Sequence, residues 1–133
     1  MSVESASSVD YDADGDKDIF LGTVNGSYLL INEGRGQFSE VVKISEKQSW
    51  TIGGTWGDLN ADGSLDLLLC NHALRPPTPE ELSSGTFPGG DGSQLLLSDQ
   101  KGGFVDASDR ISSVGKLYPN TCLMQDLDND QDL

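Results

Sequence analysis

The sequence predicts an all-β fold of consecutive four-stranded antiparallel blades, which together form part of a β-propeller. Three observations support this prediction. An acidic pattern, D-x-[DN]-x-D-G-x-x-D, begins at Asp10 and returns at Asp58, which is 48 residues further along the chain. Each copy is followed by an apolar run, a polar turn with glycine, and a second strand that opens at Phe38 or Phe104. Units of this length with four short strands are typical of propeller blades.

The negative charge of the chain is concentrated in three acidic clusters. Residues 10–18, 58–66 and 126–133 carry net charges of −4, −3 and −4, whereas the whole chain of 133 residues carries −14. A solvated acidic face requires no fixed spacing of its carboxylates, but here the spacing recurs. This charge argues against nucleic acid and anionic membrane surfaces as partners, because both bind basic patches. No apolar run is long enough for membrane insertion.

The acidic clusters divide the chain into three units. Residues 1–45 are expected to form a partial blade that lacks its first strand, residues 46–115 a full blade, and residues 116–133 the start of a third blade. In the full blade the strands are expected at about 50–57, 67–71, 94–98 and 103–108. Since a propeller needs four or more blades to close, we expect the chain to be a piece of a longer propeller whose remaining blades are partners of this segment.

The full blade carries an insertion at residues 72–93, which are rich in Pro, Gly and Ser. One helical turn is expected within it, in the sequence PPTPEELSS. In a four-stranded blade, the loop between strands one and two lies at one end. The loop between strands two and three lies at the other. The insertion is therefore expected to project from the end opposite the acidic loops, where it could recognise a ligand or be a tolerated surface loop.

The acidic clusters have the donor chemistry of a hard-cation site. Ca²⁺ takes six to eight oxygen ligands, and alternating Asp and Asn residues in a tight loop can aim several oxygens at one point. A glycine at the sixth position permits the sharp turn, the seventh position offers its main-chain carbonyl, and the Asp at the ninth closes the shell. We predict calcium ligands at these positions: Asp10, Asp12, Asp14, Asp16 and Asp18; Asp58, Asn60, Asp62, Ser64 and Asp66; Asp126, Asp128, Asp130 and Asp132.

Other interpretations of the loops fit the sequence less well. An EF-hand needs Glu at its twelfth position, which here is Leu21 or Leu69, and it needs flanking helices where these runs indicate strands. Zn²⁺ prefers Cys and His ligands, and Mg²⁺ rarely uses a dedicated protein cage. Simple Asp-rich turns would explain one or two Asp residues per turn but not the recurring spacing. The third copy has Gln131 in place of glycine and stops before its ninth position.

The two units resemble the FG-GAP/VCBS-type repeat of integrin α-subunit propellers and cartilage acidic protein-like proteins. The resemblance is carried by GTWGDLNADGSLDLLLCN and SQLLLSDQKGGFVDAS and covers nearly the whole chain outside residues 72–93. IGGTWGD departs from the Phe-Gly segment of that family, and LLLCNH departs from its Gly-Ala-Pro segment. The resemblance implies a β-propeller with Ca²⁺ between strands one and two, a secreted or cell-surface location, and a role in adhesion or in binding a protein or glycan.

No catalytic constellation is visible, and we expect that this segment is not an enzyme. His72 is the only histidine, and no nucleophile elbow or phosphate-binding loop is present. The alternative is the propeller portion of a carbohydrate-active enzyme, such as a polysaccharide lyase, with its catalytic residues outside this chain. Within these residues only His72 and Arg75 would favour it.

The remaining residues of note have structural interpretations. Cys70 and Cys122 both lie in apolar sequence, so we expect two buried free thiols, with a disulfide as the alternative. Trp50 and Trp56 flank a glycine-rich strand and are expected to pack between blades.

Overall fold

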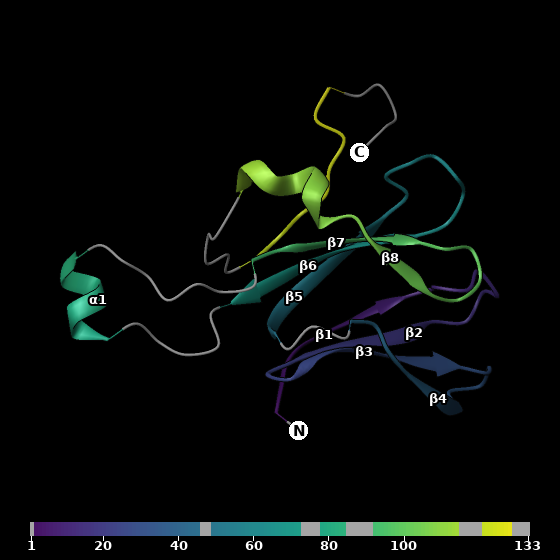
Figure 1. The fold of residues 1–133 in the computed structure, drawn as a ribbon. Helices are drawn as coiled ribbons and strands as arrows, with labels where there is room; N and C mark the ends of the chain where they lie inside the picture. Colours follow the sequence, from purple (N-terminus) through teal and green to yellow (C-terminus); the bar gives the residue numbers. More distant parts are fainter. Residues whose placement is uncertain (1, 46–48, 73–77, 85–91, 115–120, 129–133) are drawn as a thin grey trace.

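The computed structural model consists of two four-stranded antiparallel sheets, which confirms the all-β prediction (Figure 1). It describes residues 2–45, 49–72, 78–84, 92–114 and 121–128. The first sheet contains β1 (Val3–Val9), β2 (Asp18–Thr23), β3 (Gly26–Asn32) and β4 (Phe38–Lys43). The second contains β5 (Trp50–Gly57), β6 (Asp66–His72), β7 (Gln94–Ser98) and β8 (Phe104–Asp106). In both sheets each strand pairs with the next in sequence, as in the blades of a propeller.

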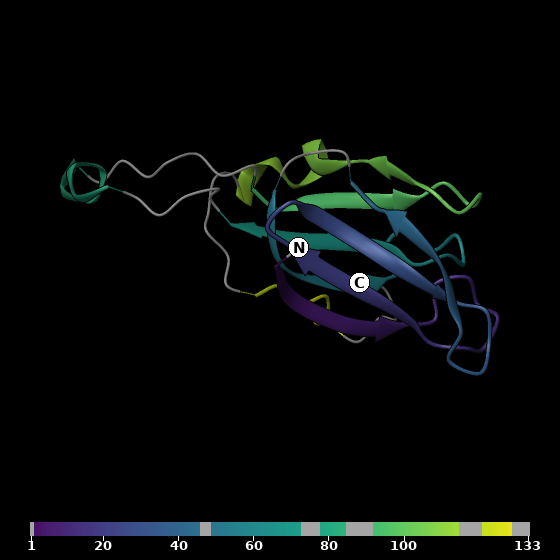
Figure 2. The same ribbon diagram turned by 90° about the horizontal axis from the view of Figure 1, so that it is seen from below.

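The two sheets lie face to face and share one hydrophobic core (Figures 1 and 2). Strand alternation explains which side chains enter this core, because every second residue of a strand points to the same face. From the first sheet, Phe20 and Leu29 are at most 1% exposed, and from the second Leu67 and Leu69 are fully buried. Strand β5 contacts β1, β2 and β3, so it joins the second sheet to the first.

Two glycines let the sheets approach closely. A Cβ atom added at Gly22 would lie 2.7 Å from the main-chain oxygen of Thr51, and one added at Gly54 would lie 3.0 Å from the ring of Phe20. Both distances are shorter than van der Waals contact, so a larger residue at either position would push the sheets apart. The absence of a side chain at these positions is therefore a packing requirement of the interface.

Aromatic side chains close the core near the acidic loops. Trp56 packs edge-to-face against Phe20 with ring centroids 5.9 Å apart, and Tyr11 lies 5.4 Å from Phe104. These pairs join residues from both sheets, which confirms the prediction that Trp56 packs between blades. Trp50 lies instead beside His72, with ring centroids 5.4 Å apart, within the second sheet.

The first unit is a complete four-stranded sheet, which corrects the prediction that it lacks its first strand. Residues Val3–Val9 form β1 and pair with β2 along its length. The sequence VESASSV has small and polar residues, five of which are exposed, so the apolar alternation that signals a strand is absent. Main-chain pairing at a sheet edge forms this strand, and pairing is invisible in side-chain patterns.

The two cysteines form a disulfide, which corrects the expectation of free thiols. The Cα atoms of Cys70 and Cys122 lie 6.0 Å apart across a sequence separation of 52 residues. Cys70 is fully buried on β6, and apolar surroundings suit a packed thiol and a half-cystine equally. The fold resolves the alternatives, because it brings Cys122 against β6, where its Sγ also lies 3.8 Å from the main-chain carbonyl oxygen of Leu68.

Other sequence predictions concern the second and third units. Strands β5, β6 and β7 match the predicted ranges closely, whereas β8 is shorter and is followed by an unpredicted 3-10 helix, η1 (Ser108–Val114). The predicted helical turn is α1 (Pro79–Ser84), which lies at the opposite end of the sheets from the acidic loops, as expected for the insertion (Figure 1). Residues 121–126, at the start of the third unit, form no strand.

Candidate metal centre

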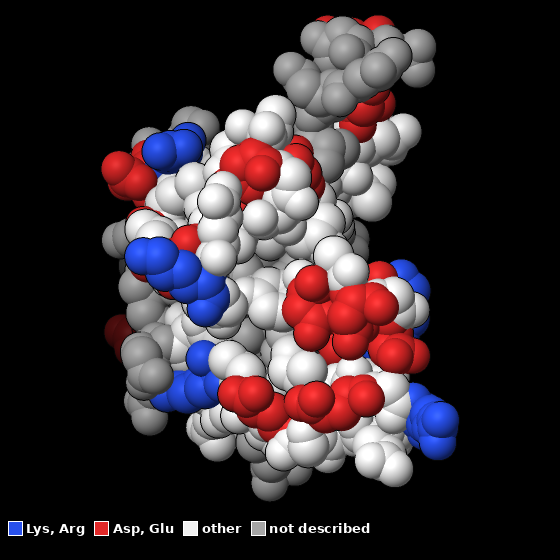
Figure 3. All heavy atoms as spheres, turned by 90° about the vertical axis from the view of Figure 1, so that its right-hand side faces the viewer, with Lys and Arg blue, Asp and Glu red and all other residues white. Residues whose placement is uncertain are grey.

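The acidic loops join the first two strands of each sheet and lie at the same end of the molecule (Figure 1). The first loop, residues 10–17, connects β1 to β2, and the second, residues 58–65, connects β5 to β6. Strands therefore flank both loops, which agrees with the exclusion of an EF-hand. Figure 3 looks onto this end and shows acidic side chains gathered in separate patches. This is the arrangement that the repeated sequence pattern predicts.

The backbone of both loops turns at the same positions. In the first loop Ala13 and Gly15 have φ of 59° and 95°, and in the second Ala61 and Gly63 have φ of 58° and 86°. These values lie in the left-handed region, which glycine adopts readily and which explains the glycine at the sixth position. Ala13 and Ala61 adopt the same region, which is less favourable for a residue with a side chain. Because both loops contain this conformation at the equivalent position, it is a shared feature of the two units.

Three carboxylates of the first loop converge on one point. Asp10, Asp12 and Asp14 each offer an oxygen, and these oxygens lie within 4.8 Å of one another. Ligands on opposite sides of one Ca²⁺ ion are separated by about 5 Å, since each Ca–O distance is about 2.5 Å. The three carboxylates can therefore bind one cation together, and their all-oxygen chemistry fits a hard ion such as Ca²⁺.

Main-chain N–H groups hold these carboxylates in place. The N–H of Asp14 donates to Asp12 Oδ1 at 3.2 Å, and the N–H of Asp16 donates to Asp14 Oδ1 at 2.8 Å. The N–H of Gly15 reaches back to Asp10 Oδ1 at 3.4 Å. Each bond fixes a side chain two to five residues earlier, so the loop backbone arranges its own ligands.

The Asp at the ninth position is buried and tied to the main chain. Asp18 is fully buried, and its two oxygens accept the N–H groups of Tyr11 at 2.8 Å and Asn32 at 2.9 Å. Because Tyr11 is the second residue of the loop and Asn32 ends β3, this one carboxylate fastens the loop to the sheet. Asp18 therefore has a structural function that the spacing alone did not reveal, in addition to its predicted role as a ligand.

The second loop repeats this construction. Asp66 is fully buried and accepts the N–H groups of Leu59 and Ser98, both at 2.9 Å. Asp58 Oδ2 accepts the N–H of Gly63 at 2.8 Å, and Asn60 Nδ2 donates to Asp62 Oδ2 at 2.9 Å. Asp58, Asn60 and Asp62 are thus held together by hydrogen bonds, in the positions that Asp10, Asp12 and Asp14 take in the first loop.

The two seventh-position residues, Asp16 and Ser64, are both partly exposed. The sequence predicts that both bind the cation through their main-chain carbonyls. The Asp16 carboxylate lies beside the β3–β4 turn, where a Cβ added at Gly34 would approach Asp16 Oδ2 to 3.1 Å. The N–H of Ser64 donates to Asp62 Oδ1 at 2.8 Å.

The surroundings shift the pKa of one carboxylate in each loop, upward in the first loop and downward in the second. The pKa of Asp12 is raised by loss of hydration and by the negative charges of its loop neighbours, which together outweigh the lowering effect of the Asp14 N–H. The pKa of Asp62 is lowered, first by the N–H of Ser64 and then by the side chains of Gln100 and Asn60. Crowded carboxylates repel one another, and the second loop offsets this repulsion with donors.

The structure brings the third cluster only partly into view. Asp126 and Asp128 are described, and they lie in a non-helical, non-strand segment. Asp130 and Asp132 lie outside the described residues, as does Arg75 in the insertion. The structure thus brings Asp10, Asp12 and Asp14 together in the first loop and links Asn60 to Asp62 by a hydrogen bond in the second, and the rest of the ligand set stays a prediction.

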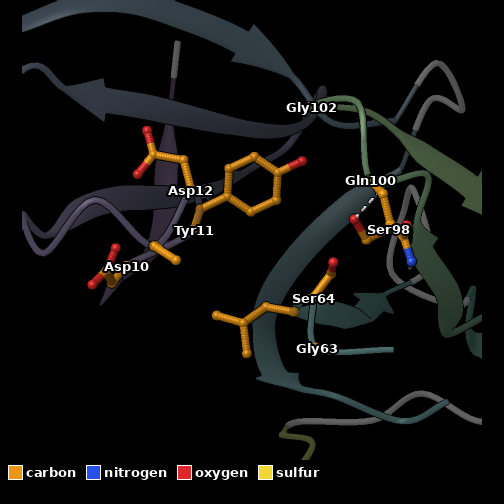
Figure 4. A pocket seen from close by; sticks show the side chains of 10 residues that line it. Asp10, Tyr11, Asp12, Gly63, Ser64, Ser98, Gln100 and Gly102 are labelled. Atoms are coloured by element: carbon orange, nitrogen blue, oxygen red, sulfur yellow. Dashed lines mark hydrogen bonds between the residues drawn. The ribbon is translucent and has the colours of Figure 1, made fainter. Parts of the chain in front are cut away.

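A cleft separates the two loops, and the sequence did not predict it. Its volume is about 260 Å³, and its lining comes from both loops and the β7–β8 turn (Figure 4). Tyr11 and Asp12 lie on one side, and Ser64, Ser98 and Gln100 lie on the other. The sequence did contain one signal for the presence of Gln100 in this cleft. The turn DQKGG has Gln100 at the position where the first unit has Gly34.

The comparisons with known proteins agree with this geometry. The FG-GAP-like repeat family matches residues 10–69, which run from the first acidic loop through the second and into β6. No curated protein and no solved structure matches the chain. Within the described residues, no helix has the length and apolarity needed to cross a membrane. Residues 10–69 of this chain are therefore similar to an FG-GAP-like repeat.

Proposed function

We propose that this chain is a calcium-stabilised β-propeller segment that serves as a structural and recognition module outside the cell. The observation that carries the proposal is the convergence of Asp10, Asp12 and Asp14 within 4.8 Å in a region similar to an FG-GAP-like repeat. The matching hydrogen-bonded loop in the second sheet extends the argument to a second site.

Calcium would act by neutralising the loops at the end of each sheet. In the metal-free protein the carboxylates of one loop repel one another across a few ångströms. A bound cation removes this repulsion and links the start of each loop to the strand that follows it. At an affinity of about 0.1 mM, typical of extracellular modules, 1 mM Ca²⁺ stabilises the fold by about 1.4 kcal/mol per site.

The extracellular assignment is supported by the disulfide between Cys70 and Cys122. Disulfides persist in oxidising compartments and are rare in the cytosol. FG-GAP-like repeats generally belong to structural and recognition proteins, and residues 10–69 are similar to that family. We therefore assign the chain no catalytic role, and we infer a protein or glycan as the partner of the assembled propeller.

The insertion between β6 and β7 supplies the candidate recognition surface. Helix α1 lies at the end opposite the calcium loops, and its Leu82 side chain is 55% exposed. Separation of the two ends would allow metal to stabilise the scaffold without blocking the partner.

Thermal denaturation in Ca²⁺ and in chelator tests the structural role of the metal. We expect a higher melting temperature in 1 mM Ca²⁺ than in EDTA, and an equal concentration of Mg²⁺ should give a smaller increase. The double variant Asp12→Asn/Asp62→Asn should lose most of the increase. A matched variant, Glu40→Gln/Asp109→Asn, removes two exposed carboxylates outside the loops and should retain it. Equal melting temperatures in Ca²⁺ and EDTA for the unmodified chain would refute the proposal.

A further inference from the structure

The second sheet has an apolar groove on the face turned away from the first sheet. Leu67 and Leu69 of β6 point toward the first sheet and belong to the shared core. Leu68 of β6 points the opposite way, because neighbouring residues of a strand alternate between its two faces. With Leu95 and Leu97 of β7 it lines a groove of about 300 Å³, which we call the outer groove. The rest of the lining comes from the second acidic loop, η1 and the segment of residues 121–128: Leu59, Asn60, Arg110, Ile111 and Met124.

The leucines of the outer groove are equivalent to residues with which the first sheet packs against the second. Asp18 accepts the N–H of Asn32 at the end of β3. The equivalent Asp66 accepts the N–H of Ser98 at the end of β7. The core between the sheets contains the first-sheet equivalents of all three leucines, and among the described residues the outer groove is open on its other side. Counted from these bonds, the equivalent pairs are Leu68 and Phe20, Leu95 and Leu29, and Leu97 and Ile31.

The segment of residues 121–128 lies on the same face of the second sheet (Figure 1). Its Met124 precedes the third acidic cluster by two residues, as Trp56 precedes the second acidic loop. Trp56 packs edge-to-face against Phe20 of the first sheet. Met124 lines the outer groove together with Leu68, which is the equivalent of Phe20. The segment therefore contacts the second sheet as β5 contacts the first.

The disulfide occupies the place of two glycines in the contact between the first and second sheets. Gly22 of β2 and Gly54 of β5 lie close to the opposite strand, and a Cβ added at either would be within 3.0 Å of it. The equivalent residues are Cys70 of β6 and Cys122, which form the disulfide with their Cα atoms 6.0 Å apart. A covalent bond between neighbouring units thus takes the place of a close glycine contact.

Burial along residues 121–126 has the two-residue period of a strand. Cys122 and Met124 are partly buried, whereas their neighbour Leu123 is 74% exposed. Alternation of this kind is typical of a strand that packs one face on a sheet. A strand also needs a paired neighbour, and the described residues contain none for this segment. Residues 121–126 are thus oriented like a first strand, although they lack the pairing of one.

We propose that the outer groove is the docking surface for a third four-stranded unit of the same repeat. Residues 121–126 are the first segment of that unit, and the disulfide fixes them to β6. The second strand of the unit places aliphatic side chains at alternating positions in the groove, as β6 places Leu67 and Leu69 against the first sheet. Stacked repeats bury a continuous core in this way, because no unit covers its apolar faces alone. The inference rests on the propeller assignment in the proposed function and deepens it, and it does not depend on calcium.

The same geometry disfavours a second copy of the chain as the occupant. The first sheet of a second copy carries its own β1, which precedes an acidic loop as residues 121–126 do. Two segments would then compete for one place, and the disulfide holds residues 121–126 there. A unit that begins with residues 121–126 has no such conflict.

Methyl NMR of the full chain with a strand peptide tests this docking surface. The peptide has the sequence of β6 with Cys70→Ser, and it supplies Leu67 and Leu69 at the alternating positions that the proposal requires. We expect saturable shifts of the Leu68 and Met124 methyl signals of the chain at millimolar peptide. The Leu67 and Leu69 methyl signals of the chain itself lie in the core and should not move.

Paired variants test whether the groove distinguishes the two faces of the strand. In the peptide, Leu69→Asp should weaken binding about tenfold, the effect of one buried leucine, and Leu68→Asp should leave it unchanged because that side chain points away. In the chain, Met124→Asp should weaken binding by a similar factor, and Leu123→Asp should not. Both chain residues lie outside the two sheets, so these variants should fold, and the core methyl signals check this.

Groove signals that do not move at millimolar peptide would overturn the proposal, and so would equal affinities of the Leu68→Asp and Leu69→Asp peptides. Sedimentation velocity tests the rival occupant, because a dimer that Met124→Asp converts to a monomer would show that a second copy covers the groove. Failure of the proposed function is a separate result. If Ca²⁺ does not raise the melting temperature but the peptide binds as expected, the role of calcium fails and the docking surface stands.

Discussion

Replacement of Asp18 by alanine should destabilise the protein even when no calcium is present. The Asp18 carboxylate is fully buried and accepts the N–H groups of Tyr11 and Asn32. The variant removes both acceptors at once and leaves two donors without partners, the N–H of Asn32 in a buried site and that of Tyr11 in a partly buried one. Each unsatisfied buried donor costs about 1–3 kcal/mol, so the free energy of unfolding should fall by about 2–6 kcal/mol.

Denaturant unfolding in EDTA measures this loss without any contribution from the metal. Asp16→Ala is the control, because it removes the same charge from a partly exposed position of the same loop. In chelator we expect a large decrease for Asp18→Ala and little change for Asp16→Ala. A second arm in 1 mM Ca²⁺ shows how much more Asp18 contributes as a ligand. Equal stabilities of the two variants in EDTA would show that Asp18 does not fasten the loop, which would refute the reasoning.

Three further predictions concern the packing of the units and the insertion. Cys122→Ser opens the disulfide to Cys70, and the loop of 52 residues implies a loss of about 4 kcal/mol, measured by denaturant unfolding against the oxidised chain. Gly22→Ala should lower the free energy of unfolding by about 1–3 kcal/mol, because the added Cβ would lie 2.7 Å from the Thr51 main-chain oxygen. An unchanged melting temperature would contradict this. Deletion of residues 74–91 should leave folding and Ca²⁺ binding intact while reducing partner binding, and loss of folding would show that the segment packs as part of the blade.

The second unit could be predicted from its sequence because each of its strands has a local signal. The strands β5 to β7 are bounded by the acidic loop, the insertion and a glycine-containing turn. Strand β1 had no such signal, because its small polar residues are held by pairing with β2. Local patterns predict elements that their own side chains specify, and they miss elements that a neighbour specifies.

The same distinction applies to the candidate site. The spacing of Asp10, Asp12 and Asp14 identified the converging carboxylates, because the loop that arranges them is continuous in sequence. The bond from the N–H of Ser98 to Asp66 ties the second loop to a residue 32 positions further along, so only the folded chain shows that they meet. The pairing of the two cysteines was ambiguous for the same reason, since it depends on where residues 121–128 lie.

Calorimetric titration of the full chain with Ca²⁺ tests the central claim most directly. The account predicts saturable binding of at least two ions per chain, with dissociation constants of about 0.1 mM, in the range of extracellular modules. The variant Asp12→Asn should lose one of these ions and retain the other, since the two loops are separate groups. Absence of binding heat from the folded chain at millimolar Ca²⁺ would contradict the account, because it would show that the converging carboxylates do not bind calcium.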